Sequence, residues 1–153
     1  MGIIAVDSAG TFEEPPIWVI ATKTVCVQKH TGICLDKKLC ANLEENIGKN
    51  WREKVSAAFI FKCVEPLIKR FDIIQVDKDF QGWRSEYIET NVKLLFGKKY
   101  YGQFPSNGPK IQFIPAEYSI DVQHAHDKTQ WARHGGLKIA QNPDLSEVIS
   151  LLE

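Results

Sequence analysis

Two short apolar runs, each ending on an aspartate, constrain the fold of this chain more than any other feature of its sequence. Ile3–Val6 is followed by Asp7, and the run at 73–76 is followed by Asp77. Both runs are brief and rich in β-branched residues, which predicts buried strands. A carboxylate at the end of a buried strand is costly unless it meets a cation or leaves the sheet. Because ligands bind at the carboxyl ends of strands in open α/β sheets, the pattern predicts a site for a hard cation.

The composition is that of one ordinary soluble domain. Of its 153 residues, 44% are hydrophobic and 25% are charged, as in an average globular protein. The 19 Lys and Arg residues balance the 19 Asp and Glu residues. This zero net charge argues against strong non-specific binding to nucleic acid, although a neutral total can hide a local basic patch. No apolar run is long enough for a membrane span and no signal peptide is visible, so we expect a cytoplasmic protein.

The four cysteines, Cys26, Cys34, Cys40 and Cys63, do not form a metal-binding motif. They contain no C-x-x-C pair, and their spacing does not match zinc ligation. We expect buried thiols that act as small hydrophobic side chains.

The predicted elements begin with a β-meander and then alternate between helices and strands. Strands are predicted at 3–7, 17–27, 32–35, 73–77 and 110–114. Helices are predicted at 39–47, 51–65, 85–96, 119–133 and 143–152. Asn50 and Glu53 have the form of a capping box at the start of the helix predicted at 51–65. Pro66 should break that helix, and Gly97 should end the helix predicted at 85–96. Trp83 is expected in the core.

This order resembles the ribonuclease H-like fold, in which a five-stranded mixed sheet with an antiparallel opening meander is flanked by helices. In that superfamily one metal-binding aspartate lies on the first strand and another at the end of the fourth strand, beside it in the sheet. Asp7 and Asp77 occupy these two positions. The resemblance implies one α/β domain over residues 1–153 that binds Mg²⁺ or Mn²⁺ through Asp7 and Asp77.

The turn after the first strand carries two further resemblances. Asp7-Ser8-Ala9-Gly10 is similar to the Asp-Glu-Ala-Gly start of type 2 ribonucleases H, with Ser8 in place of the glutamate. The same turn also looks like the phosphate-binding turn of actin-like ATPases and sugar kinases, but those enzymes need two such domains. The replacement at Ser8 leaves type 2 substrate recognition open.

The ribonuclease H-like resemblance implies two more carboxylate ligands. In type 1 ribonucleases H a glutamate near the start of the first helix faces the two aspartates, and Glu53 is the best-placed match. Glu44 and Glu45 are alternatives, and Glu53 is equally well explained as part of the capping box. The last ligand comes from the final helix or the loop before it, where Asp127 is favoured over Asp121.

The segment around these last two aspartates also contains histidines. Helical spacing places His124, Asp127 and Trp131 on one face of the predicted helix. Asp121 shares much of that face, whereas His126 points elsewhere. His124 is expected beside the metal or as a proton shuttle. His124-x-His126 suits zinc or iron only on a strand, where residues two apart share a face.

These residues together imply a divalent-metal-dependent nuclease acting on RNA, an RNA/DNA hybrid or branched DNA. Two ions about 4 Å apart can activate a water on one side of a phosphodiester and stabilise the leaving oxygen on the other. Lys128 and Arg133 would hold phosphates, and Trp131 would stack on a base. The alternative is a non-catalytic ribonuclease H-like module that binds a protein or nucleic-acid partner, which the zero net charge and Ser8 favour. The sequence leaves open whether the chain forms a homodimer.

Overall fold

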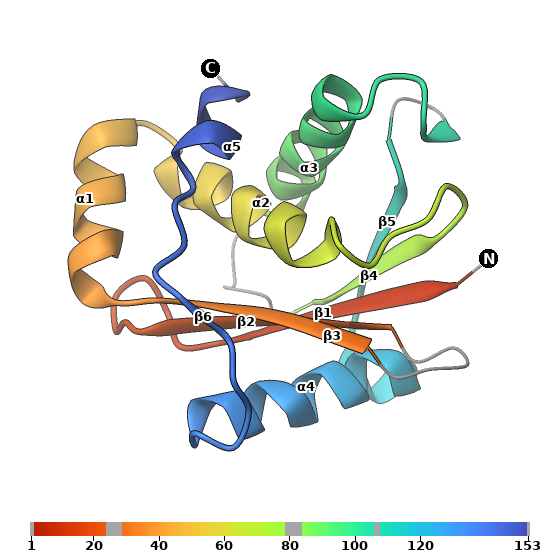
Figure 1. Ribbon diagram of the computed structural model, residues 1–153, viewed down its shortest axis with the longest axis horizontal. Coiled ribbons are helices and arrows are strands. Elements are labelled where there is room, and N and C mark those ends of the chain that lie inside the picture. Colours follow the sequence, from red (N-terminus) through yellow and green to blue (C-terminus); the bar gives the residue numbers. More distant parts are fainter. Residues whose placement is uncertain (1, 24–28, 79–83, 106–107, 153) are drawn as a thin grey trace.

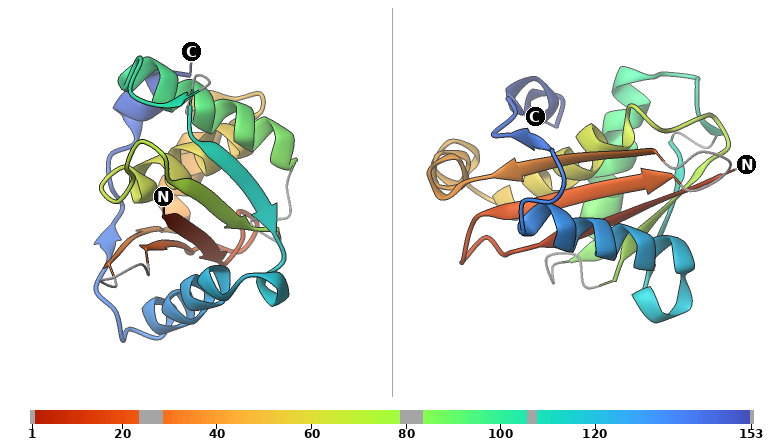
Figure 2. Two further views of the ribbon diagram at one scale, coloured as in Figure 1. Left: turned by 90° about the vertical axis from the view of Figure 1, so that its right-hand side faces the viewer. Right: turned by 60° about the horizontal axis from the view of Figure 1, so that its bottom comes forward.

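One mixed β-sheet separates two layers of helices in the computed structural model, which describes residues 2–23, 29–78, 84–105 and 108–152 (Figure 1). The first layer contains α1 (Lys37–Ile47), α2 (Trp51–Val64), α3 (Ser85–Lys99) and α5 (Ser146–Ser150). Helix α4 (Ile120–Arg133) lies on the opposite face of the sheet, as both views of Figure 2 show. The predicted extension of the second strand through 24–27, with Cys26, and Trp83 lie outside the described residues.

The sheet has six strands in the order β5-β4-β1-β2-β3-β6. In chain order the strands are β1 (Ile3–Ala9), β2 (Ile17–Lys23), β3 (Lys29–Leu35), β4 (Ile73–Asp77), β5 (Lys110–Ile114) and β6 (Ala140–Gln141). The first three form the expected antiparallel meander, and β4 pairs parallel with both β1 and β5. The prediction of five strands was wrong because β6, which pairs parallel with β3, is too short to show any sequence period.

The direction of the crossovers explains why α4 lies apart from the other helices. The connections from β3 to β4 and from β4 to β5 move toward one edge of the sheet, whereas the connection from β5 to β6 returns to the other edge. Crossovers between parallel strands are almost always right-handed. Opposite directions of travel therefore place the connecting helices on opposite faces.

The two faces of β1 differ in chemistry. Ile4 and Val6 belong to the main core, which the sheet shares with α2 and α3. Ala5 faces the other way and packs against Val122 and Ala125 of α4. Asp7 is two residues after Ala5 and therefore points to the same face of the sheet. A carboxylate is thus buried on the side that α4 covers.

Local signals located most of the helix ends. Gly48 caps α1 with a φ of 75°, and α2 ends at Val64, just before Pro66. Helix α3 continues through Gly97 to Lys99, so the predicted end was wrong. A glycine within a helix costs only about 1 kcal/mol, and the ring of Phe96, packed 4.7 Å from that of Phe61, favours continuation.

The thiols of Cys34, Cys40 and Cys63 are buried, as expected for small hydrophobic side chains. Burial raises the pKa of Cys63 to about 12 and that of Cys40 to about 11, so these two cysteines remain thiols at neutral pH. None of the described helices combines the length and the apolar character that crossing a membrane requires.

Candidate metal centre

Asp7 and Asp77 lie on adjacent parallel strands, directly after the paired residues Val6 of β1 and Val76 of β4. Because the two strands run in register, both carboxylates project to the same face of the sheet. Asp7 is 3% exposed and Asp77 is 7% exposed. The sheet therefore brings two buried carboxylates together from positions far apart in the sequence.

His126 of α4 completes a group of three side chains. Its Nδ1 lies 3.2 Å from Oδ2 of Asp7, and one ligand atom from each of Asp7, Asp77 and His126 lies within 4.8 Å of the others. The side chain of His126 is 51% exposed. The group is buried on its sheet side and accessible on its histidine side.

Two features of α4 place His126 over Asp7. Ser119 caps the helix through its Oγ, which accepts the N–H of Val122 and donates to Oε1 of Gln75 on β4 at 2.7 Å. Small side chains at Ala125 and Thr129 are buried against the sheet and let the helix backbone approach it closely. The start of α4 is thus tied to the strand that carries Asp77.

Burial and the neighbouring carboxylate of Asp77 perturb the ionisation of Asp7. Burial, and after it the hydrogen bond and negative charge of Asp77, raise the pKa of Asp7 to about 7. The charge of His126 and the N–H of Ser8 act in the opposite direction without cancelling this rise. The carboxylate pair therefore retains a proton near neutral pH when no cation is present. Binding of a divalent cation would displace that proton, because metal ligands must be ionised.

Glu53, the predicted third carboxylate, is buried in α2 and engaged by Arg84. Its Oε1 accepts from Nε and Nη2 of Arg84 at 2.8 and 2.6 Å. The capping box with Asn50 was wrong, since Asn50 makes no cap hydrogen bond and its Oδ1 accepts from the same guanidinium. Glu53 does not belong to the group of Asp7, Asp77 and His126. A guanidinium is a strong partner for a carboxylate and satisfies it locally.

The other predicted ligands also lie outside the group. His124 and Asp127 are exposed on α4, and Asp121 is half-buried in its first turn. Each residue of a helix is rotated by about 100° from the one before it, so Asp127 faces away from the sheet on which Ala125 packs. The structure thus brings His126, which was expected to point elsewhere, to Asp7 in place of these three residues.

The sequence does indicate which face of α4 packs on the sheet, but through its small and apolar residues rather than its polar ones. Val122, Ala125, Thr129 and Ala132 are small or apolar and recur at three- and four-residue spacing, which marks the buried stripe of α4. His126 borders that stripe, one residue after Ala125. The stripe, rather than the spacing of the polar residues, decides which side chain reaches the sheet.

The residues predicted to bind a substrate are all on α4. Lys128 is half-buried, and Trp131 and Arg133 are exposed. Burial lowers the pKa of Lys128. The three side chains are carried by the helix that provides His126 and are accessible to a ligand.

Comparison of the chain with protein-family models, with curated proteins and with solved structures found no match. The ribonuclease H-like resemblance therefore remains a prediction from the order of the elements and from the positions of Asp7 and Asp77. Since a fold hosts many functions, a function for this protein has to be inferred from the chemistry of the site.

Proposed function

We propose that Asp7, Asp77 and His126 bind one divalent cation and that the protein uses it to hydrolyse phosphodiester bonds in RNA, an RNA/DNA hybrid or branched DNA. The observation that carries this proposal is the convergence of two buried carboxylates and an imidazole, with their ligand atoms within 4.8 Å of one another. Ligands at about 2.1 Å from a cation lie at most about 4.2 Å apart. Any two of the ligand atoms that are further apart than this would move closer together when a cation binds.

The donor set favours Mn²⁺ over Mg²⁺. Carboxylates suit Mg²⁺, Ca²⁺ and Mn²⁺, whereas imidazole suits transition metals. Two carboxylates and one imidazole therefore suit a metal that accepts both kinds of ligand, such as Mn²⁺, Fe²⁺ or Zn²⁺. The coordination positions of the cation that these three residues do not fill would be left to water and substrate.

The residues of the site have distinct roles in this proposal. A cation held there supplies a Lewis acid and lowers the pKa of a bound water. Asp7 and Asp77 hold the cation on the rigid sheet, and His126 holds it from the solvent side. Lys128 and Arg133, on the same helix as His126, attract the phosphates of the substrate.

The arrangement of the strands supports a ribonuclease H-like assignment. Without β6, the order is β3-β2-β1-β4-β5, with the first and fourth strands adjacent and an aspartate on each. Two features depart from the expected pattern: the extra strand β6, and a histidine where a carboxylate was expected.

A second candidate function is a non-catalytic module of the same fold that binds a protein or nucleic-acid partner. Cleavage with two metal ions needs more carboxylates than this group provides, and Glu53 is held by Arg84. The described group therefore has ligands for one cation rather than two.

A metal titration tests the proposal, with the melting temperature as the readout. Mn²⁺ at a hundred times its dissociation constant should stabilise the protein by about 2.7 kcal/mol, which for a chain of this size is a rise of roughly 5–11 °C. Asp7→Asn, Asp77→Asn and His126→Ala should each abolish the rise. Asp127→Asn is the matched control, because Asp127 is exposed on the same helix, and it should keep the full rise.

Cleavage assays then separate the two candidate functions. Labelled RNA, RNA/DNA hybrid and branched DNA are incubated with Mn²⁺ or Mg²⁺ and with each variant. Cleavage that Asp7→Asn abolishes supports the nuclease. A thermal shift without cleavage of any substrate favours the non-catalytic module, and the absence of any shift refutes the metal site.

A further inference from the structure

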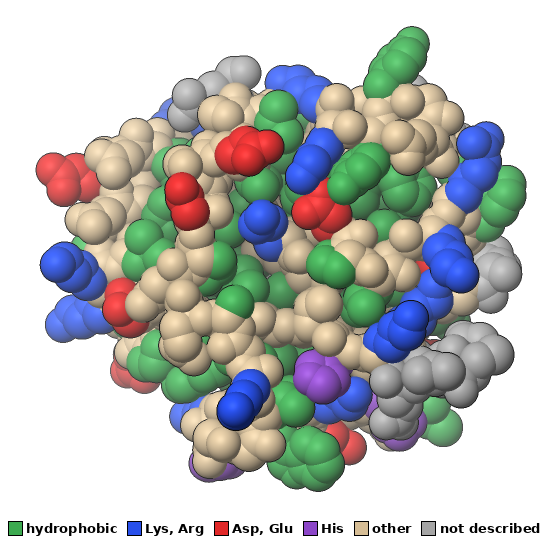
Figure 3. All heavy atoms as spheres, viewed as in Figure 1, with side chains coloured by type: hydrophobic (Ala, Val, Ile, Leu, Met, Phe, Trp, Pro, Cys, Tyr) green, Lys and Arg blue, Asp and Glu red, His purple; other side chains and the backbone are tan. Residues whose placement is uncertain are grey.

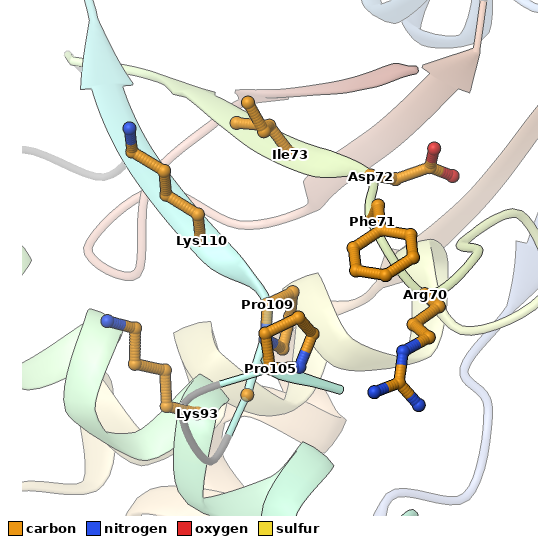
Figure 4. Close-up of a pocket in the computed structure, with 9 residues that line it drawn as sticks. Arg70, Phe71, Asp72, Ile73, Lys93, Pro105, Pro109 and Lys110 are labelled. Carbon is orange, nitrogen blue, oxygen red and sulfur yellow. The ribbon is translucent and has the colours of Figure 1, made fainter. Parts of the chain in front are cut away.

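A pocket of about 470 Å³ lies at the end of the sheet opposite Asp77 (Figure 4). It is lined by the segment 70–73, which leads into β4, by Lys93 of α3, and by residues on the way into β5 that include Pro105 and Pro109. Ile73 and Asp77 are four residues apart on β4, which is about 13 Å along a strand. The volume is within the range of small-molecule sites, roughly 300–1,000 Å³.

Two sets of contacts give the pocket fixed walls. The buried carboxylate of Asp72 accepts the N–H groups of Gly2 and Lys69, both at 2.8 Å, and pairs with Nζ of Lys23 at 2.5 Å. On the other wall, a Cβ built on Gly108 would lie 3.2 Å from Cα, Cβ and Cγ of Lys93. Backbone therefore packs directly on α3 at this point.

The charges of the pocket favour an anion. Arg70, Lys93 and Lys110 line it, and its one carboxylate, Asp72, is already paired with Lys23. Although burial opposes its ionisation, the Lys23 ammonium and the backbone N–H donors hold the pKa of Asp72 below its ordinary value. Figure 4 shows the carboxylate of Asp72 pointing away from Lys93 and Lys110.

The basic character extends beyond the pocket itself. Figure 3 shows several Lys and Arg side chains along the right-hand side of the molecule, where the segment between α2 and β4 runs in Figure 1. A local excess of cations thus exists on a chain whose net charge is zero. Such a patch attracts an anionic ligand during encounter.

The pocket also offers a flat apolar surface. Phe71 is 62% exposed, which is unusual for a phenylalanine, and its ring lines the pocket with Pro105 and Pro109. The guanidinium carbon of Arg70 lies 5.4 Å from the centre of the Phe71 ring. Aromatic rings flanked by cations hold nucleic-acid bases by stacking while the cations hold the phosphates.

We infer that this pocket binds a nucleotide unit, with its base against Phe71 and its phosphate held by Lys93 and Lys110. The site is separate from the group of Asp7, Asp77 and His126 and needs no metal ion. A free mononucleotide and a nucleotide within a single strand present the same chemistry, so both serve as probes.

The experiment measures binding in the presence of EDTA. Adenosine monophosphate is titrated by calorimetry, and a short fluorescein-labelled oligothymidine by fluorescence anisotropy. Phe71→Ala and Lys110→Gln should each weaken binding about 5-fold or more, since one stacked base or one phosphate contact is lost. Both side chains are exposed, so the variants should fold. Tyr118→Ala and Lys37→Gln remove exposed side chains elsewhere and should bind as the wild type does.

Each outcome has one meaning. Binding of the mononucleotide identifies a site for free nucleotides, and binding of the oligonucleotide alone identifies a contact with a single strand. Either result supports the inference if Phe71→Ala weakens the binding. Competition by inorganic phosphate with no effect of Phe71→Ala would overturn it in favour of a simple anion site. Lack of binding of both probes at millimolar concentration also overturns it. Asp7→Asn should bind both probes normally, so failure of the metal site does not affect this test.

Discussion

Replacing Asp7 by asparagine should stabilise the metal-free protein at pH 8 and remove its response to Mn²⁺. In the folded protein the pKa of Asp7 rises from 3.8 to about 7, chiefly because the carboxylate is buried and secondarily because Asp77 lies beside it. Ionising Asp7 therefore works against folding. Asparagine has nearly the same shape but cannot ionise, so the variant avoids this cost.

The magnitude follows from the pKa. At about 1.4 kcal/mol per tenfold change in the ionisation equilibrium, the rise to about 7 corresponds to at most about 4 kcal/mol. Asparagine cannot share a proton with Asp77 as a protonated Asp7 does, so we expect a gain of about 1–3 kcal/mol. For a chain of this length the melting temperature should increase by roughly 2–12 °C.

The pH dependence has a definite sign. Between about pH 4 and pH 7 the folded protein retains a proton on Asp7 that the unfolded chain has lost. Stability of the wild type therefore falls as the pH rises through this window and levels off above it. The advantage of Asp7→Asn should be small at pH 4, grow up to about pH 7 and stay constant at pH 8.

Urea unfolding in EDTA at several pH values measures this advantage directly. Asp127→Asn is the control, since exposed substitutions change stability by about 0.5 kcal/mol or less. The reasoning is refuted if Asp7→Asn is no more stable than the wild type at pH 8. It is equally refuted if the difference between the two proteins does not vary with pH.

Three further substitutions test the packing around the sheet. Ala125→Leu should overpack α4 against β1 and cost about 1–3 kcal/mol of stability. By moving His126 it should also weaken Mn²⁺ binding at least tenfold in a thermal titration. Unchanged Mn²⁺ affinity would contradict the positioning role of α4. Phe61→Ala should cost about 3–5 kcal/mol in urea unfolding, because the buried ring loses its contact with Phe96; a loss below about 1 kcal/mol would show that the core refills. Asp72→Asn should cost about 1–3 kcal/mol at pH 7. Because the folded-state pKa of Asp72 is lowered, this difference should be present above about pH 4 and shrink as the pH falls through the folded-state pKa; a difference that does not shrink on acidification would contradict the pairing with Lys23.

The two aspartates of the site could be predicted from the sequence because strand geometry fixes the direction in which each side chain points. In a strand the side chains alternate strictly between two faces, so an aspartate at the end of a short buried run has a known direction. Asp7 and Asp77 needed only the pairing of β1 with β4 to meet. That pairing was an implication of the resemblance to the ribonuclease H-like fold.

The position of His126 beside Asp7 could not be predicted from the sequence in this way. The rotation of a helix about its axis is set by what packs under it, and the small side chains of Ala125 and Thr129 decide it for α4. The ion pair between Glu53 and Arg84 could not be predicted for a related reason, because Arg84 is 31 residues further along the chain. Both features depend on tertiary contacts that local spacing does not encode.

The strand β6 was missed because its two residues are too few to show a strand pattern, and contacts of the next residue, Asn142, help to hold it at the edge of the sheet. The backbone N–H of Asn142 donates to the carbonyl of Cys34 at 2.7 Å, and its side chain exchanges two hydrogen bonds with Asp36. An asparagine side chain thus anchors the edge of the sheet at a point where two strand residues alone would be too few.

The parallel pairing of β1 with β4 makes the folding of the chain and the assembly of the proposed metal site a single event. Asp7 and Asp77 are 70 residues apart, and the intervening chain forms the meander and two helices before it returns to the sheet. In an unfolded chain these two carboxylates are not held side by side, so an ion held by both would act as a cross-link that only the native state can form. Hydrogen exchange that proceeds by global unfolding would therefore slow down throughout the central strands when the ion binds, including at amides far from the ion itself.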